Sequence, residues 1–279
     1  MGFGDLTRIN TNLQALRAMN ALQNTNSRLG DHQLRLATGS RLNKAEDDSA
    51  GYSIAKKLEA KVRGQNQALA NVGDAKSMLT VAEGSLNTIM DILQTMKEKS
   101  VQAANDSIGS EERDLIKNQL DALSSEVTDL LQDTTFNGVN LYSSNATSLQ
   151  FQVNAESGDT FVVNIPATTV GAIGVNTSSL IVSSAASAGA TISVVDNAIT
   201  VIAARLGELG DNQNRLSFKQ QNLETSITNY EAARSRIADA DFAKEQMEMI
   251  KLQILQQTGT AALAQANIAP QSVLQLMQQ

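Results

Sequence analysis

The sequence predicts a mainly α-helical fold, a long antiparallel helical bundle or coiled coil that carries one small β-hairpin. Apolar residues recur at helical spacings of three, four and seven along both ends of the chain. Aromatic residues make up 3% of the 279 residues, with no Trp, no Cys and two Pro. The core must therefore consist mostly of Leu, Ile, Val and Ala, which is unlike the aromatic-rich core and pockets of a compact enzyme.

The first helix is expected to end near Gly39, which can adopt a left-handed C-terminal cap. Its stripe consists of Leu6, Ile9, Leu13 and Leu16, followed at seven-residue spacing by Leu22, Leu29 and Leu36. A polar joint follows at residues 43–51. Its carboxylates lack the alternating ligands and glycine of a calcium loop, so a solvated or intersubunit salt-bridge joint is favoured over a cation site.

The next two helices are expected at about 53–104 and from Ser110 onward. The Ser110 hydroxyl is placed to cap free backbone N–H groups, and acidic residues follow at 111 and 112. This third helix ends before the Asn-Gly turn at 137–138. The alternation at 149–153 and 161–165 then flanks a short loop at 156–159 and predicts the β-hairpin, at about 149–165.

The last third of the chain returns to helix near Val194, after a Ser-, Thr-, Ala- and Gly-rich segment in which surface loops are expected. A seven-residue repeat predicts a coiled coil antiparallel to the earlier helices. The repeat consists of Ile202, Leu209, Leu216, Leu223, Tyr230 and Ile237. A second stripe follows toward the end of the chain and consists of Met247, Ile250, Ile254, Ala261 and Ala264.

The composition also limits the partners. A net charge of −7 with scattered basic residues argues against nucleic acid or an anionic membrane as the main partner. No apolar run reaches about 18 residues, and residues 1–14 lack the apolar core of a signal peptide. No catalytic, cofactor or metal site is expected, and His32, the single histidine, is interpreted as a helix-face residue.

Several motifs, taken in order, resemble those of bacterial flagellin. They are residues 9–12 (Ile-Asn-Thr-Asn), the joint at 43–51, residues 100–105 and 135–138, and at the carboxyl end residues 235–242, 263–267 and 269–274. The resemblance covers residues 8 to about 165 and 195–277. It implies a structural subunit that polymerises head-to-tail into the flagellar filament for swimming motility, not an enzyme.

The resemblance also implies a domain organisation. Residues 1–42 and 237–279 would be inner-tube helices, residues 43–165 and 195–236 an outer-tube bundle, and 166–194 a short variable surface region. The implied partners are copies of the chain, the flagellar export apparatus, a chaperone that binds the C-terminal stripe, the filament cap and the hook–filament junction proteins. Neither nucleic acid nor membrane insertion is implied, and the location is the extracellular flagellum, reached by type III export without a cleaved signal peptide.

Particular residues follow from this interpretation. The expected polymerisation residues of the terminal helices are Leu6, Ile9, Leu13, Leu16, Leu22, Leu29, Leu36, Phe242, Met247, Ile250, Ile254, Leu263 and Leu274. The expected joint between the tubes consists of Glu46, Asp47, Asp48 and Gly51. The expected O-glycosylation candidates are Thr177, Ser178, Ser179, Ser183, Ser184 and Ser187.

At three further positions the chain departs from the pattern by which stimulating flagellins activate a vertebrate Toll-like receptor. Thr95 and Lys99 replace the Arg and Leu of that pattern, and Gln119 replaces an acidic residue. Weak receptor activation is therefore expected.

Two other functions stay open from the sequence. A hook–filament junction protein would share the terminal architecture, and abundance would distinguish it from the bulk filament subunit. A cytoplasmic coiled-coil signalling module is the more distant alternative, and cell fractionation would exclude it if the protein is sheared from cells as polymer.

Overall fold

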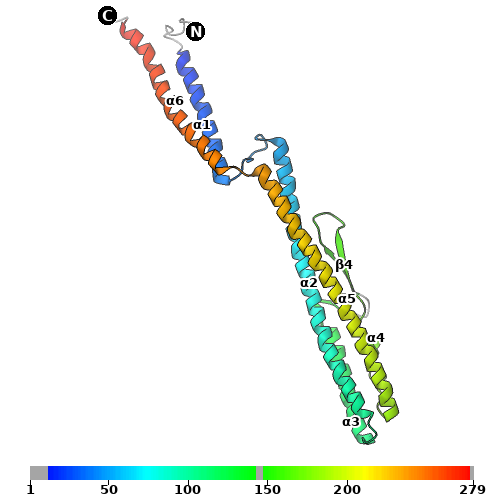
Figure 1. Cartoon of the computed structure of the whole chain (residues 1–279). Coiled ribbons are helices and arrows are strands. Elements are labelled where there is room, and N and C mark those ends of the chain that lie inside the picture. The colour runs from blue at the N-terminus through cyan, green and yellow to red at the C-terminus, as the bar shows by residue number, and fades with distance from the viewer. Residues whose placement is uncertain (1–11, 143–146, 277–279) are drawn as a thin grey trace. The chain divides into compact units, whose positions relative to one another are not determined.

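The computed structural model of the chain describes residues 12–142 and 147–276 (Figure 1). Two compact units emerge, one made of residues 1–60 with 230–279 and the other of residues 61–229. We call them the terminal unit and the central unit. The helices are α1 (Leu13–Thr38), α2 (Ser49–Ala103), α3 (Ser110–Asp133), α4 (Val170–Ile173), α5 (Ala185–Ala238) and α6 (Phe242–Leu276). The strands are β1 (Thr135–Phe136), β2 (Val139–Asn140), β3 (Thr147–Gln152) and β4 (Thr160–Ile165). The predicted mainly helical fold is confirmed.

The core of the central unit lies between α2, α3 and α5. The first four residues of the seven-residue repeat predicted for α5 are confirmed as its buried face, since Ile202, Leu209, Leu216 and Leu223 are all within the core. The last two, Tyr230 and Ile237, are only partly buried and belong to the terminal unit. α2 contributes its own repeat of buried residues, which includes Leu79, Leu86 and Leu93. Two hydrogen bonds show that α2 and α5 run antiparallel. Lys76 on α2 donates to Gln220 on α5 at 3.2 Å, and Glu83 on α2 accepts from Gln213 on α5 at 2.8 Å.

The predicted hairpin is confirmed as β3 paired antiparallel with β4, with Leu149 opposite Val163. The alternate residues Phe161, Val163 and Ile165 are buried in the core. The hairpin lies beside α2 and α5 (Figure 1). On α2, Gly64 permits this approach, because a Cβ there would lie 2.7 Å from the Cβ of Ala155.

A second strand pair, formed by β1 and β2, was not predicted from the sequence. β1 and β2 form a two-residue ladder around the Asn-Gly turn. Asn137 has φ 49° and Gly138 has φ 78°, and the left-handed conformation at both positions suits a two-residue hairpin turn. The turn was predicted correctly, but strands of two residues are too short to leave an alternation in the sequence.

The expected start of α3 was correct in position and wrong in mechanism. The helix begins at Ser110, but the N-cap residue is Gly109, which makes no side-chain capping hydrogen bond. Ser110 is therefore the first helical residue and not the cap. Glu111 and Glu112 do lie in the first turn, where they complement the helix dipole.

The segment 166–194, expected as surface loops, is only partly on the surface. Ile173, Val175 and Leu180 are buried, so this segment covers the core of the central unit. α5 also begins at Ala185, nine residues before the expected Val194. The early start has a local cause, because Ser184 and Ser187 accept hydrogen bonds from each other's backbone N–H at 3.2 and 2.9 Å, as in a capping box.

Among the described residues, α5 is the one helix long and apolar enough to cross a membrane. Its apolar residues at 195, 198 and 202 are instead fully buried in the protein core. A core helix passes the same length and composition test, and 28% of the tested window of α5 is buried, so the core packing accounts for part of its apolar run.

The terminal unit contains α1, the connector 39–48 and α6. Asn12 caps α1 by accepting a hydrogen bond from the Ala15 N–H at 3.0 Å. Gly39 ends the helix with φ 68°, which confirms the predicted left-handed cap. α1 and α6 lie side by side and run antiparallel (Figure 1).

Candidate functional site

α6 turns one face toward α1 and a different face toward solvent. Its inward positions repeat at spacings of four and three, the period of a two-helix seam. These positions are Glu245, Met249, Leu252, Gln256, Gly259, Leu263 and Ala266. Leu252 is 1% exposed, so the seam excludes water at its middle.

The stripe that the sequence predicts for α6 lies on the outward side. Met247 is 66% exposed, Ile250 47% and Ile254 55%. Two residues along an α-helix differ by about 200° around its axis, so a stripe at 247, 250 and 254 faces away from a seam at 245, 249 and 252. The terminal unit thus leaves an apolar face of α6, which we call the outward face, exposed and without a partner among the described residues of that unit.

The predicted residues of α1 divide in the same way. Leu22, Leu29 and Leu36 lie on the side facing α6, with Leu29 buried, whereas Leu16 is exposed. The side facing α6 consists of residues 15, 18, 22, 25, 29, 32 and 36, all wholly or partly buried. Leu6 and Ile9 lie outside the described residues, as does the side chain of Leu274.

Three contacts define the alignment of the two helices. The Asn12 amide donates to the Ala266 carbonyl at 2.7 Å, and Gln256 donates to the Asn26 side chain at 2.8 Å. Between them Gly259 faces Leu22, where an added Cβ would lie 3.3 Å from the leucine Cδ1.

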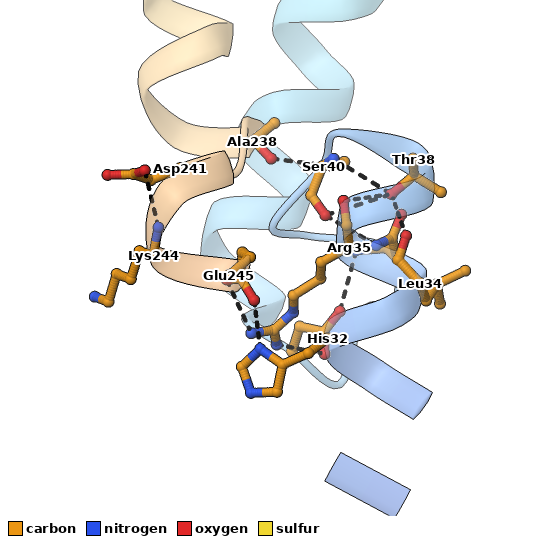
Figure 2. A network of polar contacts seen from close by, with 11 residues as sticks. His32, Leu34, Arg35, Thr38, Ser40, Ala238, Asp241, Lys244 and Glu245 are labelled. Carbon is orange, nitrogen blue, oxygen red and sulfur yellow. Dashed lines mark hydrogen bonds and ion pairs between the residues drawn. The ribbon is translucent and has the colours of Figure 1, made fainter. Parts of the chain in front are cut away.

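A polar network lies at the end of α1, the start of α6 and the connector (Figure 2). The Glu245 carboxylate on α6 contacts Nδ1 of His32 and lies 3.8 Å from a guanidinium nitrogen of Arg35, both on α1. Arg35 also reaches Asp47 in the connector at 3.5 Å. The Glu245 side chain is 9% exposed, so its charge depends on these partners for compensation. His32 was interpreted only as a helix-face residue, because a lone histidine in the sequence does not reveal its partner.

The four predicted joint residues have separate local roles. Asp47 accepts hydrogen bonds from the backbone N–H groups of Lys44 and Asn43, at 2.9 and 3.1 Å. These bonds, that of Lys44 foremost, and the nearby Arg35 hold the pKa of Asp47 below its ordinary value. Glu46 is exposed and pairs with Lys44 at 3.1 Å.

The other two joint residues form the start of α2. The Asp48 carboxylate accepts a hydrogen bond from the Gly51 N–H at 3.0 Å, as an N-cap does. Gly51 is buried, and a Cβ there would lie 2.4 Å from Asp48 Oδ2 and 3.2 Å from Leu42. The glycine therefore permits the cap.

The connector is also joined to the α5–α6 link by backbone hydrogen bonds. Ser40 and Asp239 form an antiparallel bridge. Arg41 N–H donates to the Ala238 carbonyl at 2.6 Å, and Ala240 N–H to the Gly39 carbonyl at 2.9 Å. Sequence reasoning missed this pairing, since its partners lie about 200 residues apart and carry no pattern.

The remaining predicted positions belong to the central unit. Thr95 and Gln119 are exposed and Lys99 is partly buried. In the Ser/Thr cluster, Thr177, Ser178, Ser183 and Ser184 are exposed. The hydroxyl of Ser179 bonds to the Asn176 side chain, and that of Ser187 takes part in the α5 cap.

The described residues hold no cluster of three or more His, Cys, Asp or Glu side chains able to bind a metal ion. A cavity of about 350 Å³ near Tyr142 and Thr168 is lined by hydroxyl, amide and apolar groups, without a carboxylate, imidazole or amine.

The chain is similar to known proteins over nearly its whole length. Residues 9–147 match the bacterial flagellin N-terminal helical region, and residues 192–277 match the bacterial flagellin C-terminal helical region. A flagellin of Bacillus subtilis is 34% identical over 97% of this chain and 99% of its own length. A flagellin of Treponema pallidum is 34% identical over 96% and 99%.

Two solved structures are also similar. Bacillus cereus flagellin superposes with a TM-score of 0.50 and 27% identity, covering 59% of this chain and 94% of the other. A putative flagellar hook-associated protein from Vibrio parahaemolyticus gives a TM-score of 0.61 at 15% identity, covering 69% of this chain and all of the other. At that identity the second likeness concerns the fold alone.

Proposed function

Because the chain belongs to the bacterial flagellin family and is a structural subunit of the flagellar filament, we propose that its terminal helices α1 and α6 are the polymerisation device. The observation that supports this proposal is the outward face of α6. Met247, Ile250 and Ile254 are each about half or more exposed there. Apolar stripes of this kind on a soluble subunit mark a surface that another chain covers.

Neighbouring copies of the chain are the partners that fit this face. A pair of helices buries only one seam, so the outward face becomes buried when several subunits pack together. A head-to-tail contact that does not close into a ring propagates as an open helix. The terminal residues 1–42 and 237–279 would then form the inner tube, and residues 43–165 with 195–236 the outer tube, with 166–194 as a short variable region.

Family membership supports the remaining partners as part of this proposal. The chain would reach the cell exterior through the flagellar export apparatus and add beneath a filament cap, above the hook–filament junction proteins. A chaperone would cover the outward face of α6 before export, as a helix in a groove. The role is structural, and no catalysis, cofactor, nucleic acid or membrane insertion is proposed.

Two further properties are proposed for the exposed surface. Thr95 and Gln119 present uncharged side chains at the receptor-equivalent positions, which supports weak activation of the vertebrate receptor. A reporter-cell assay at ordinary flagellin doses tests this, and full activation would exclude it. Of the candidate glycosylation sites, Thr177, Ser178 and Ser183 are exposed, and the Ser183 hydroxyl lies 3.5 Å from that of Ser187 in the α5 cap. A native filament protein at its unmodified mass would exclude glycosylation.

Electron microscopy of seeded reassembly tests the main proposal. The full chain is compared with the fragment 43–236, which lacks both terminal helices and keeps the core of the central unit. Filaments from the full chain alone support the proposal. Circular dichroism of the fragment provides the control, because the fragment must be helical for its failure to polymerise to count. Filaments from a helical fragment would refute the proposal. The abundance of the chain in sheared filaments separates a filament subunit from a junction protein.

A further inference from the structure

α6 could in principle present either of two faces to α1. The inward face has Met249, Leu252 and Leu263 as its large apolar residues and is interrupted by Gln256 and Gly259. The outward face contains the exposed Met247, Ile250 and Ile254. The outward face is at least as apolar over these turns, so hydrophobic burial does not by itself select the inward face for α1.

Charge separates the two faces. Glu245 is the first residue of the inward seam, and no residue at 247, 250 or 254 is charged. On α1, the side chains that meet Glu245 are His32, 15% exposed, and Arg35, 26% exposed. Three ionisable side chains are thus concentrated at one end of an otherwise uncharged seam, which extends to Ala266.

We propose that Glu245, through its contacts with His32 and Arg35, is the positioning residue that selects which face of α6 packs against α1. With α6 rotated by about 200°, Met247 would occupy the level of Glu245. His32 would then lose its carboxylate partner and face an apolar side chain, and Arg35 would keep only its contact with Asp47. Leaving buried polar and charged groups without partners is strongly unfavourable, and such residues at seam positions commonly fix the geometry of a helix pair.

Two uncharged contacts favour the same orientation. Gln256 reaches Asn26 from the inward face only, and Gly259 lets α6 approach Leu22 more closely than a larger residue would. Both lie several turns from Glu245 along α6. The carboxylate would therefore select the orientation at the joint, and the close approach would maintain it along the helix.

This selection matters for assembly, and that last step rests on the proposed function. If α6 turned its outward face to α1, the Ile250 and Ile254 side chains would be covered within the chain. The face left for neighbouring copies would then contain Gln256 and Gly259. Selection by Glu245 keeps the apolar side chains Met247, Ile250 and Ile254 available.

Disulfide cross-linking tests the proposal directly, because the chain has no native cysteine. The pair Leu22→Cys with Gly259→Cys reports the observed orientation. The matched control pair, Leu22→Cys with Ala261→Cys, reports the rotated one. Intrachain products are separated from interchain products by gel mobility, and each pair is read in the soluble full chain and in filaments.

The background substitutions are His32→Glu, Glu245→Leu and the swap His32→Glu with Glu245→His. In the unaltered background the 22/259 pair should form faster than the 22/261 pair by at least about tenfold, consistent with the cost of leaving a buried polar group without its hydrogen-bond partner. His32→Glu places two carboxylates together and should lower this ratio toward one, although the Gln256–Asn26 contact still favours the observed orientation. The swap restores a carboxylate–imidazole pair and should recover the ratio, which loss of packing alone would not produce.

Glu245→Leu keeps an apolar seam that can still pair, so it tests selection without removing helix association. Its ratio should also fall toward one. A ratio that stays high in both His32→Glu and Glu245→Leu overturns the proposal, as does a ratio near one in the unaltered background. Filament formation by the cysteine-free chain is scored separately. A selective cross-link in a chain that makes no filaments would refute the proposed function and leave the role of Glu245 standing.

Discussion

The two faces of α6 lead to a prediction that one pair of alanine substitutions can test. Ile254 is 55% exposed on the outward face, and Leu252 is 1% exposed on the inward face, only two residues away. Both substitutions remove a branched aliphatic side chain from the same helix. Ile254→Ala should nevertheless weaken mainly the filament, whereas Leu252→Ala should weaken mainly the subunit.

The magnitude for Ile254→Ala follows from its exposure. Complete burial of an isoleucine side chain is worth about 1.5–3 kcal/mol, and roughly half of that remains available to a neighbouring subunit. Loss of about 1 kcal/mol per subunit should raise the critical concentration for polymerisation roughly fivefold. The isolated subunit should change little, because alanine favours helix slightly more than isoleucine does.

Leu252→Ala should instead weaken the subunit itself. Removing a fully buried leucine costs about 2–5 kcal/mol, which here falls on the α1–α6 pairing. Thermal unfolding followed by circular dichroism measures this loss, and sedimentation after seeded reassembly gives the critical concentration. The reasoning is refuted if Ile254→Ala polymerises at the unaltered critical concentration, or if it loosens the subunit as much as Leu252→Ala does.

Three further substitutions test the joint and the core. Gly51→Ala should lower the free energy of unfolding in urea by about 1–2 kcal/mol, because its Cβ displaces the Asp48 cap; an unchanged midpoint would show that the cap is dispensable. Burial raises the pKa of Tyr142 to about 12, so its contribution to stability is complete below about pH 10 and is lost as the pH rises toward 12. Tyr142→Phe should cost about 1 kcal/mol at pH 7 and show a flatter alkaline unfolding curve, and equal slopes would contradict this. The lowered pKa of Asp47 gives stability that is present above about pH 4 and is lost as the pH falls through the folded-state pKa. Asp47→Asn should therefore be less stable at pH 7 and less sensitive to acid. An acid-unfolding profile that matches that of the unaltered chain would contradict this.

Much of the fold could be predicted because its signals are local. The repeat that includes Ile202, Leu209 and Leu216 identified the buried face of α5, and Gly39 identified the end of α1. The early start of α5 was missed because its first turns are rich in small residues. The signal that could have found it is the capping pair Ser184 and Ser187, which precedes that run.

The candidate site was predictable only in part, because the spacing of apolar residues does not show which neighbour their helix face packs against. The spacing of Met247, Ile250 and Ile254 correctly predicts an apolar face on α6. It does not say whether that face packs against α1 or is exposed. The inward seam was also hard to recognise as an apolar stripe in the sequence, since the charged residue Glu245 occupies one of its positions.

The sequence by itself determined which segments are helical, where the hairpin lies and which family the motifs resemble, because propensity, periodicity and caps act over a few residues. Only the tertiary structure decided that Glu245 meets His32 and Arg35, and that Ser40 pairs with Asp239. Those partners lie about 200 residues apart, and their pairing depends on the packing of two helices whose mutual rotation is set by contacts and not by pattern. The exposed face of α6 is a consequence of that rotation.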